Sequence, residues 1–265
     1  VDSFDHALAF IEKVGYPIVV KPDNGVGATS TYKLNNQQEL EYFFATKDDR
    51  IYIMEEYVNG HVETYDGIAD SNKNVLIANS TIMLNSIMDN VNDHCDTAFQ
   101  NRFVKGTDIE KVGQKVVKAF DTRSRFFHFE FFRLDADKDG LGKKGDLVGL
   151  EVNMRAPGAY MPDMMNFSYD SDVYTVWADM IIYDKCFLDL KQQYLVAYIG
   201  RRDNFDYLYD NSQLRDQFGF DIVLDVDVPE ALSAAMGNHV FMVRSNNQDH
   251  LDYMIDEFLK RKDGS

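Results

Sequence analysis

The chain has 265 residues, which is enough for one large domain or two to three small ones around a hydrophobic core. Hydrophobic residues make up 45% of the chain, charged residues 27% and aromatic residues 13%, a composition that excludes a disordered tail. The formal net charge of −17 repels phosphate backbones, so we expect no nucleic-acid partner, although a nucleotide pocket needs only a few local cations.

Cysteine content and hydropathy bear on the cellular setting. The two cysteines, Cys95 and Cys186, are too few for a disulfide framework, and neither belongs to a CxxC or Cys/His cluster. We therefore expect a cytoplasmic protein. No apolar run reaches the length of a membrane span and no signal peptide is visible, so we expect no membrane partner. The sequence opens on Val1, within a helix-like pattern, and is interpreted as an excised fragment.

The first predicted elements are a helix and a buried strand. Ser3 is a favourable N-cap for a helix whose apolar residues lie on one side, and Gly15 ends it. The apolar run from Ile18 to Val20 is typical of a short buried strand.

A lysine and a glycine-bearing loop follow this strand. Lys21 stands at its end, residues 23–30 are rich in glycine and small polar side chains, and another strand is expected near 31–34. Gly25 and Gly27 allow backbone N–H groups to approach phosphate oxygens, and Lys21 adds a positive charge. The segment is neither a Walker A loop nor a GxGxxG fingerprint. Taken alone, it fits a hairpin with a flexible turn equally well.

The next residues show alternating helix and strand periodicity. The expected elements are a helix over 36–45, strands over 51–54, 61–68 and 74–83, and a helix capped by Asp108 that runs to Phe120. Residues 85–103 have no clear period and are expected to form a loop.

Two later strands carry carboxylates. Residues 126–132 alternate His128 and Glu130 with phenylalanines, and a carboxylate among so many aromatic rings is costly unless it is paired. Glu130 is therefore predicted to be a metal ligand that faces Glu151. The alternative is a glutamate on the solvent-exposed face of an antiparallel strand.

The second of these strands, residues 147–152, leads into a polar triplet. Side chains alternate across a strand, so Glu151, Asn153 and Arg155 are expected on one face, with Leu150 and Val152 on the other. Carboxylate and amide oxygens suit Mg²⁺, and an arginine suits phosphate or acyl-phosphate oxygens. A surface ladder of salt bridges is the alternative interpretation.

The segment that joins these strands imitates an EF-hand loop. Residues 135–146 place aspartates at positions one, three and five and a glycine at position six. An EF-hand requires a helix on each side, whereas both flanks are predicted strands. We therefore expect a polar hairpin loop.

The last third of the chain begins with a helix after Asp170. Its apolar stripe is expected to be core and comprises Val173, Val176, Trp177, Met180 and Ile181. Three short strand–helix pairs follow and predict a small α+β module. They comprise strands over 194–200, 220–224 and 239–243 and helices over 212–218, 229–236 and 249–260.

Several of these residues together carry a family resemblance, which spans roughly residues 16–184. They are Lys21 with its glycine loop, the segment Glu55–Glu56–Tyr57–Val58, Glu63, Glu130, and the triplet Glu151, Asn153 and Arg155. In order and spacing this set resembles the ATP-grasp superfamily, and most closely the branch with biotin carboxylase and carbamoyl-phosphate-synthase-like ligases. The resemblance implies an α+β fold in which two α+β subdomains grip ATP. We expect subdomains over 1–60 and 61–190, followed by the small α+β module over 191–265.

The resemblance also implies roles in nucleotide binding. Lys21 would contact the α- or β-phosphate beneath a lid formed by residues 23–30, including Gly25 and Gly27. The segment 55–58 would be the hinge, where backbone groups of Glu56 and Val58 contact the adenine edge. Glu63 would bind the ribose hydroxyls.

The metal and reaction sites are implied in the same way. Glu130, Glu151 and Asn153 would hold one or two Mg²⁺ or Mn²⁺ ions that bridge the ATP phosphates. Arg155 would stabilise an acyl-phosphate formed when a carboxylate attacks the γ-phosphorus.

The implied function is an ATP- and Mg²⁺-dependent carboxylate–amine or carboxylate–thiol ligase that acts on small molecules. The alternative is a non-catalytic nucleotide-binding or scaffold domain with the same fold. Members of the superfamily usually carry a further N-terminal domain of the same protein, which would be a partner of this chain. Without it we expect the fragment to bind ATP without completing the ligation. A homodimer is compatible with this interpretation.

Overall fold

The computed structural model describes residues 1, 3–24, 30–84 and 96–263. The chain divides into two compact units, Val1–Asn59 and Gly60–Ser265. Among the described helices, none is long and apolar enough to cross a membrane.

The first unit packs two helices against a small antiparallel sheet in the strand order β2-β1-β3. Its elements are α1 (Phe4–Val14), β1 (Ile18–Pro22), β2 (Tyr32–Leu34), α2 (Gln37–Thr46) and β3 (Tyr52–Glu56). The Ser3 hydroxyl accepts a hydrogen bond from the His6 N–H at the start of α1, and Gly15, with a φ of 75°, ends the helix. The expected helices and strands of this unit are thereby confirmed.

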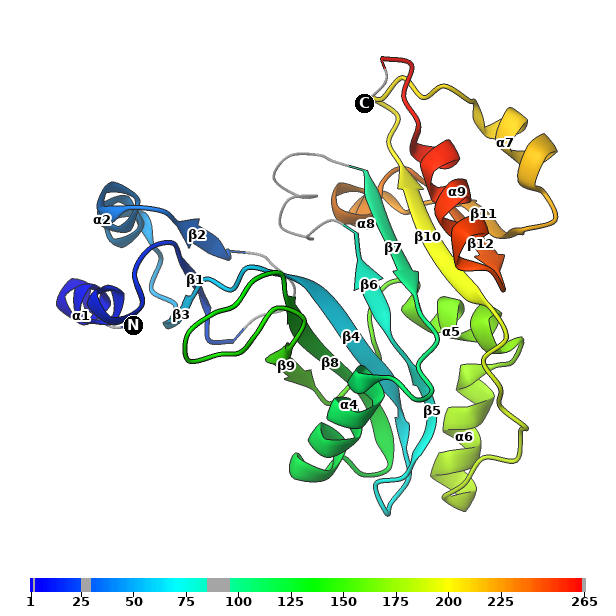
Figure 1. Cartoon of the computed structure of the whole chain (residues 1–265), viewed down its shortest axis with the longest axis horizontal. Coiled ribbons are helices and arrows are strands. Elements are labelled where there is room, and N and C mark those ends of the chain that lie inside the picture. Colours follow the sequence, from blue (N-terminus) through cyan, green and yellow to red (C-terminus); the bar gives the residue numbers. More distant parts are fainter. Residues whose placement is uncertain (2, 25–29, 85–95, 264–265) are drawn as a thin grey trace. The chain divides into compact units, whose positions relative to one another are not determined.

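The second unit is built on one large sheet, which has nine strands within the described residues. Its order is β11-β12-β10-β7-β6-β4-β8-β9, with β5 paired to β4 (Figure 1). The strands are β4 (Gly60–Ala69), β5 (Val75–Asn79), β6 (Thr81–Met83), β7 (Thr97–Asn101), β8 (Arg125–Leu134), β9 (Leu147–Asn153), β10 (Leu195–Arg201), β11 (Ile222–Asp227) and β12 (His239–Ser245). The helices are α4 (Asp108–Ala119), α5 (Met161–Tyr169), α6 (Val173–Tyr183), α7 (Asn211–Phe218), α8 (Glu230–Met236) and α9 (Gln248–Leu259).

Helices cover both faces of this sheet. On one face α4 packs on Tyr65, Phe127 and Phe129, and α7 and α9 pack on alternate residues of β10 and β12. On the other face α6 packs on Ile68 and Phe126, and α5 packs on β10 and β12. We call these the α4 face and the α5 face. Because successive side chains of a strand point to opposite faces, each polar residue in these strands can be assigned to one of them.

Three local expectations are wrong. Part of the expected loop over 85–103 is strand β7, while residues 85–95 lie outside the described part of the chain. The expected strand over 74–83 is divided at Ser80 into β5 and β6. Thr107, and not Asp108, caps α4, because its hydroxyl accepts the Glu110 N–H.

The hairpin prediction for residues 135–146 is confirmed. β8 and β9 pair in antiparallel register from Arg133↔Leu147 to His128↔Asn153, so the EF-hand-like loop joins two strands. An EF-hand would require helices at both ends of this loop.

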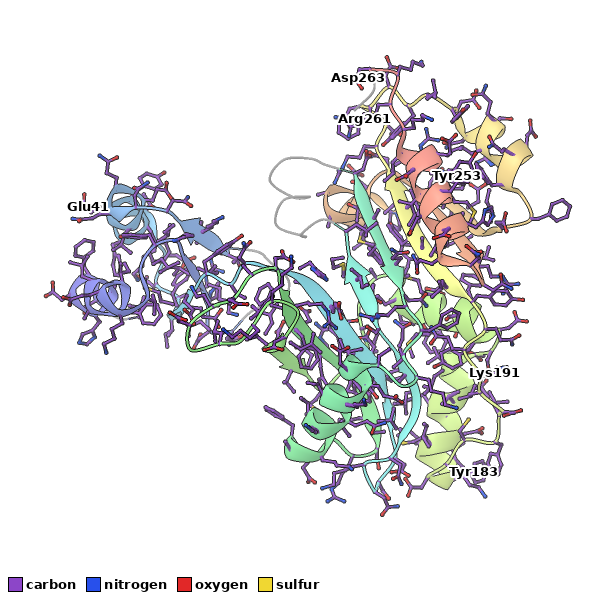
Figure 2. The ribbon with its side chains drawn as sticks, viewed as in Figure 1. Glu41, Tyr183, Lys191, Tyr253, Arg261 and Asp263 are labelled. Carbon is purple, nitrogen blue, oxygen red and sulfur yellow. The ribbon has the colours of Figure 1, made fainter. Side chains whose placement is uncertain are left out.

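The apolar stripe of α6 is narrower than expected. Val173, Val176 and Met180 are buried, whereas Trp177 and Ile181 are 41% and 52% exposed. Tyr183, at the C-terminal end of the helix, is also exposed (Figure 2). The helix rests on the sheet through one line of side chains three and four residues apart, and the adjacent line remains at the surface.

The C-terminal residues share the large sheet. Strand β10 pairs with β7 from Ala197↔Gln100 to Gly200↔Thr97, so hydrogen bonding continues across residue 190. The expected strands and helices of this region are present. The division into 1–60, 61–190 and 191–265 stays a prediction.

The contact between α4 and β4 yields a test of this packing. A Cβ added at Gly113 would overlap the ring of Tyr65, which is fully buried and stacked on Phe127. Alanine gains about 1 kcal/mol over glycine in a helix, but overpacking costs about 1–3 kcal/mol. We expect Gly113→Ala to lower the free energy of unfolding by up to about 2 kcal/mol in urea titrations. Gly149→Ala, which meets no atom within 4 Å, is the control and should change it by less than about 0.5 kcal/mol.

Candidate functional site

Three adjacent strands place six polar residues on the α5 face of the large sheet. Strand β8 lies between β4 and β9, and residues directly opposite each other in antiparallel strands share a face. One row across the three strands is Thr64, Glu130 and Glu151, and the next row is Asp66, His128 and Asn153. We call this arrangement the six-residue grid.

The alternation of β8 accounts for the grid. Phe127, Phe129 and Phe131 point to the α4 face and are buried there, which leaves His128 and Glu130 on the α5 face. A β-bulge at Leu150 changes the register, so that Phe131 pairs with Gly149 while Glu130 pairs with Glu151. The bulge thereby keeps the two carboxylates opposite each other.

The predicted metal ligands are brought together in this grid. Glu130 and Glu151 are directly paired, and residues so paired have Cα atoms about 4.5–5.5 Å apart. Asn153 is one strand position away on the same face, and its side-chain amide nitrogen is buried without a hydrogen-bond partner. Neither Glu151 nor Arg155 forms an ion pair within the described residues, so these residues do not form the alternative ladder of salt bridges.

The donor set fits a magnesium–nucleotide site. Mg²⁺ is usually held by one or two carboxylates together with substrate phosphates and water, not by an all-protein cage. Within the described residues, no group of three His, Cys, Asp or Glu side chains is placed to hold a metal ion. Glu130 and Glu151 supply two hard oxygen donors, and Asn153 lies beside them.

His128 joins two carboxylates within the grid. Its Nδ1 contacts Asp66 Oδ1, and its Nε2 lies 3.0 Å from Glu130 Oε1. Burial alone would lower the pKa of His128, but the two carboxylates outweigh burial and raise the pKa to about 10. Sequence reasoning noted His128 without a role and missed Asp66. An aspartate within the apolar run of β4 could have signalled a buried partner, because an unpaired buried charge is costly.

Buried hydrogen bonds continue from Asp66 across the sheet towards β10. The Thr64 hydroxyl donates to Asp66 Oδ2 at 2.5 Å. The network then crosses β6, β5 and β7, and its side chains are fully buried. Its members, in order, are Asp66, Thr64, Thr81, Asn79, Asn101 and the Val196 N–H. The grid is thus connected to a strand of the C-terminal region.

Glu63, the predicted ribose ligand, lies on the other face of the sheet from the carboxylate pair. It points to the α4 face, opposite to Glu130 and Glu151, and is only 1% exposed. Its carboxylate accepts hydrogen bonds from Arg133 at 2.5 and 2.8 Å and from Arg102 at 3.1 and 3.2 Å. Both oxygens therefore have partners within the fold, and a role towards ribose hydroxyls stays a prediction.

The predicted phosphate and hinge residues lie at one edge of the first unit. Lys21 Nζ forms an ion pair with Glu55 at 2.8 Å. Glu55 and Glu56 end β3, and the Tyr57 N–H donates to the carbonyl of Pro17. Val58 follows just before the division between the two compact units. The predicted lid residues Gly25 and Gly27 lie outside the described residues.

Arg155 follows β9 and is exposed to solvent. Its guanidinium donates to the carbonyl of Ala156 at 3.0 Å. Met154, the preceding residue, packs on the α4 face. The guanidinium therefore keeps most of its donors for other contacts.

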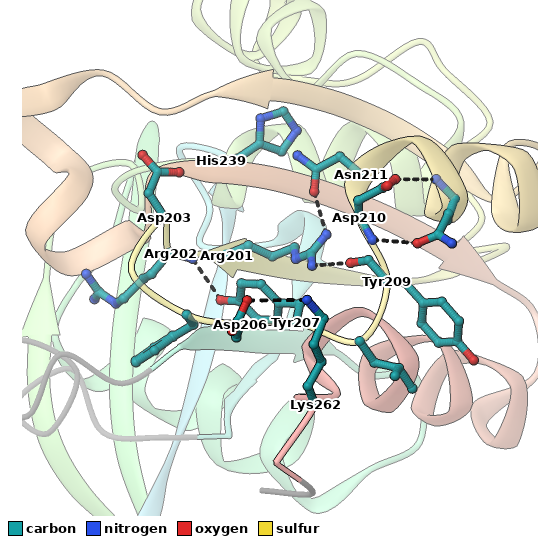
Figure 3. Close-up of a pocket in the computed structure, with 13 residues that line it drawn as sticks. Arg201, Arg202, Asp203, Asp206, Tyr207, Tyr209, Asp210, Asn211, His239 and Lys262 are labelled. Atoms are coloured by element: carbon teal, nitrogen blue, oxygen red, sulfur yellow. Dashed lines mark hydrogen bonds and ion pairs between the residues drawn. The ribbon is translucent and has the colours of Figure 1, made fainter.

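A separate cavity of about 420 Å³ lies at the end of β10 (Figure 3). Arg201, which lines it, is 4% exposed. Its guanidinium donates to Asn211 and to the carbonyl of Tyr209 and lies 3.9 Å from the ring centre of Tyr207. These contacts tie the loop over 202–210 and the start of α7 to β10.

Part of the chain is similar in sequence to a known protein family. Residues 6–126 match the family model of the ATP-grasp domain. No curated protein sequence matches the chain. The family match assigns residues 6–126 to an ATP-grasp domain, and the similar solved structures show that the chain has the ATP-grasp fold, as predicted.

Solved structures share this fold at low sequence identity. An L-amino acid ligase from Bacillus licheniformis is 16% identical with a TM-score of 0.67, and the match covers 95% of this chain and 64% of that one. An N5-carboxyaminoimidazole synthetase from Staphylococcus aureus is 13% identical with a TM-score of 0.68, covering 98% and 65%. The biotin carboxylase domain of a 2-oxoglutarate carboxylase from Hydrogenobacter thermophilus is 14% identical with a TM-score of 0.57, covering 92% and 56%. The chain therefore spans less than two thirds of each of these structures.

The Glu63 ion pairs predict an acid-sensitive contribution to stability. Burial alone would raise the pKa of Glu63, but hydrogen bonds and charge from Arg133, with Arg102, lower it below its ordinary value of 4.5. A carboxyl with a lowered pKa stabilises the fold above its unfolded pKa, and this contribution is lost as the pH falls through the folded pKa. We expect Glu63→Gln to lower the free energy of unfolding by about 3–5 kcal/mol at pH 7.

The free energy of unfolding of the wild type and of Glu63→Gln is measured by urea titration at pH 7 and at stepwise lower pH. The difference between wild type and variant should begin to narrow below pH 4.5, where Glu63 of the unfolded chain takes up a proton while Glu63 of the folded chain is still ionised, and it should vanish as the pH falls through the lowered folded pKa. Asp108→Asn, which removes the more exposed partner of Arg133, is the control and should cost about 1 kcal/mol or less. A difference that stays constant down to pH 3 would contradict the assignment.

Proposed function

We propose that the chain is the nucleotide-binding core of an ATP- and Mg²⁺-dependent ligase that joins a small-molecule carboxylate to an amine or thiol. The supporting observation is the direct pairing of Glu130 with Glu151 in an ATP-grasp fold, with Asn153 on the same face. Three of the similar structures are described as complexes with ADP or MgADP, which supports a nucleotide as the ligand.

The second unit would supply the metal site. Glu130 and Glu151 would each give a carboxylate oxygen to the cation, and Asn153 would add its amide oxygen. The metal, when bound, would neutralise charge on the phosphates during phosphoryl transfer. Arg155, with its free donors, would stabilise the acyl-phosphate oxygens as negative charge moves onto them.

The first unit would supply contacts to the nucleotide. Lys21 would leave Glu55 and contact a phosphate, and the backbone of Glu56 and Val58 would contact the adenine edge. The acceptor carboxylate becomes reactive only after its oxygen is converted to a leaving group, which is the purpose of the acyl-phosphate. A carboxylate–amine or carboxylate–thiol ligase therefore needs the phosphate contacts and the metal carboxylates together.

The first test of this function is the coupling between cation and nucleotide. Without a cation, Glu130 and Glu151 repel the phosphates, so ADP should bind at least tenfold more tightly in Mg²⁺ than in excess chelator. Glu151→Gln should remove most of this difference. Calorimetry with ADP under both conditions measures it.

The control is Asp139→Asn, in the EF-hand-like hairpin loop. This variant should retain the full magnesium effect, because Asp139 is remote in sequence and register from the grid. Equal ADP affinity with magnesium and with chelator in the wild type would overturn the metal assignment. Loss of the magnesium effect in Asp139→Asn alone would indicate that the cation binds in the hairpin loop.

Substitutions of Lys21 and Arg155 should affect different steps, nucleotide binding and phosphate release respectively. Lys21→Ala removes a contact to bound nucleotide and should weaken MgATP binding about 10- to 100-fold, whereas Arg155→Ala should change it by less than about threefold. Arg155→Ala should instead lower phosphate release with a panel of amino acids and bicarbonate, measured on the longest natural form of the protein, because this chain by itself is expected to bind ATP without completing the ligation. Lys13→Ala, on the exposed surface of α1, serves as the charge-matched control. A collapse of MgATP binding in Arg155→Ala would show that Arg155 contacts ATP itself.

The same panel of amino acids and bicarbonate distinguishes a ligase from the alternative, a non-catalytic nucleotide-binding domain. A nucleotide-binding domain without activity would bind MgATP through Lys21 and the carboxylates and would release no phosphate with any acid. Because the chain covers only part of the similar structures, the panel should also be run with the longest natural form of the protein.

A further inference from the structure

We propose that His128, held by Asp66, is a positioning residue that fixes one oxygen of Glu130 and leaves the other free for the cation. The inference rests on the proposed function, because it concerns the same carboxylates. It adds two residues to the site that the family resemblance does not supply.

The two contacts of His128 define the orientation of its ring. Both ring nitrogens face carboxylate oxygens, those of Asp66 and Glu130. The ring therefore bridges a buried carboxylate and the predicted metal ligand.

Asp66 holds the ring of His128 in place. Asp66 is fully buried and His128 is 5% exposed. One oxygen of Asp66 contacts His128 and the other accepts the Thr64 hydroxyl, so the carboxylate cannot rotate without breaking a buried hydrogen bond. Thr64 is fixed in turn by the Thr81 N–H, at 3.1 Å. The ring of His128 is therefore anchored in the backbone of the sheet.

Glu130 is the most exposed member of this series. Within the described residues its carboxylate has one hydrogen bond, from His128 Nε2 to Oε1. The side chain is 24% exposed, so its second oxygen can reach a ligand. The arrangement matches the general design of metal sites, in which an outer hydrogen bond orients the ligand.

The contact with His128 also bears on the pair of carboxylates. Glu130 and Glu151 are directly opposite each other, and like charges in this relation repel. The hydrogen bond between His128 and Oε1 opposes rotation of Glu130 away from this face. The second oxygen of Glu130 can then be presented together with Glu151.

The test measures Mn²⁺ binding to the ADP-saturated chain by calorimetry and by electron paramagnetic resonance of the free ion. We expect His128→Gln to weaken Mn²⁺ binding about 10- to 100-fold, the usual cost of losing an outer hydrogen-bond partner. ADP affinity in excess chelator should change by less than twofold. Asp66→Asn should weaken Mn²⁺ binding in the same direction, and it provides a second variant if His128→Gln does not fold.

A matched control exists in β12. His239 also contacts two carboxylates, Asp225 at 2.8 Å and Asp227 at 2.7 Å, in the C-terminal region. His239→Gln removes the same kind of histidine and should leave Mn²⁺ binding within twofold of wild type. The double variant His128→Gln/Glu130→Gln should bind Mn²⁺ no more weakly than Glu130→Gln, because His128 acts through Glu130.

The outcomes separate this inference from the proposed function. If the wild type shows no Mn²⁺ binding coupled to ADP, the proposed function itself fails, and the positioning role fails with it. If the wild type shows the coupling and both single variants keep it within twofold, only the role of His128 is overturned. Equal losses of ADP affinity with and without Mn²⁺ would show that His128 supports the fold and not the cation ligand.

Discussion

The antiparallel pairing of β8 with β4 on one side and β9 on the other is the constraint on which the candidate site depends. A shift of one residue between β8 and β9 would send Glu130 and Glu151 to opposite faces, and the same shift between β4 and β8 would separate Asp66 from His128. The bulge at Leu150 is part of this constraint, since it lets the strands pair on both sides of Glu130 while the two carboxylates stay aligned.

The balance of charged side chains differs between the two faces of the sheet. On the α4 face, Glu63 is paired with Arg133 and Arg102, so the charges are neutralised within the fold. On the α5 face, Asp66 and Glu130 share the single positive charge of His128, and Glu151 adds another carboxylate. This negative excess suits a cation, and a closed network such as that of Glu63 would not provide it.

Much of the fold followed from periodicity, because a strand or helix with one buried face repeats its apolar residues every two or three to four positions. The helices of the first unit, the β8–β9 hairpin and the strand–helix order after residue 190 were predicted in this way. Strand β7 was not, since its short polar sequence acquires a strand conformation through pairing with β6 and β10. The roles of Lys21, the hinge and the lid still rest on the resemblance.

For the site, the sequence alone determined that Glu151 and Asn153 share a face and that Glu130 needs a partner, because both statements concern neighbours along one strand. It could not determine that Glu63 faces away from Glu130, or that Asp66 reaches His128 from 62 residues away. These relations depend on which strands pair and in what register, which is decided by the packing of α4 on one face and of α5 and α6 on the other. Only the tertiary structure therefore separated the carboxylates that stabilise the fold from those available to a ligand.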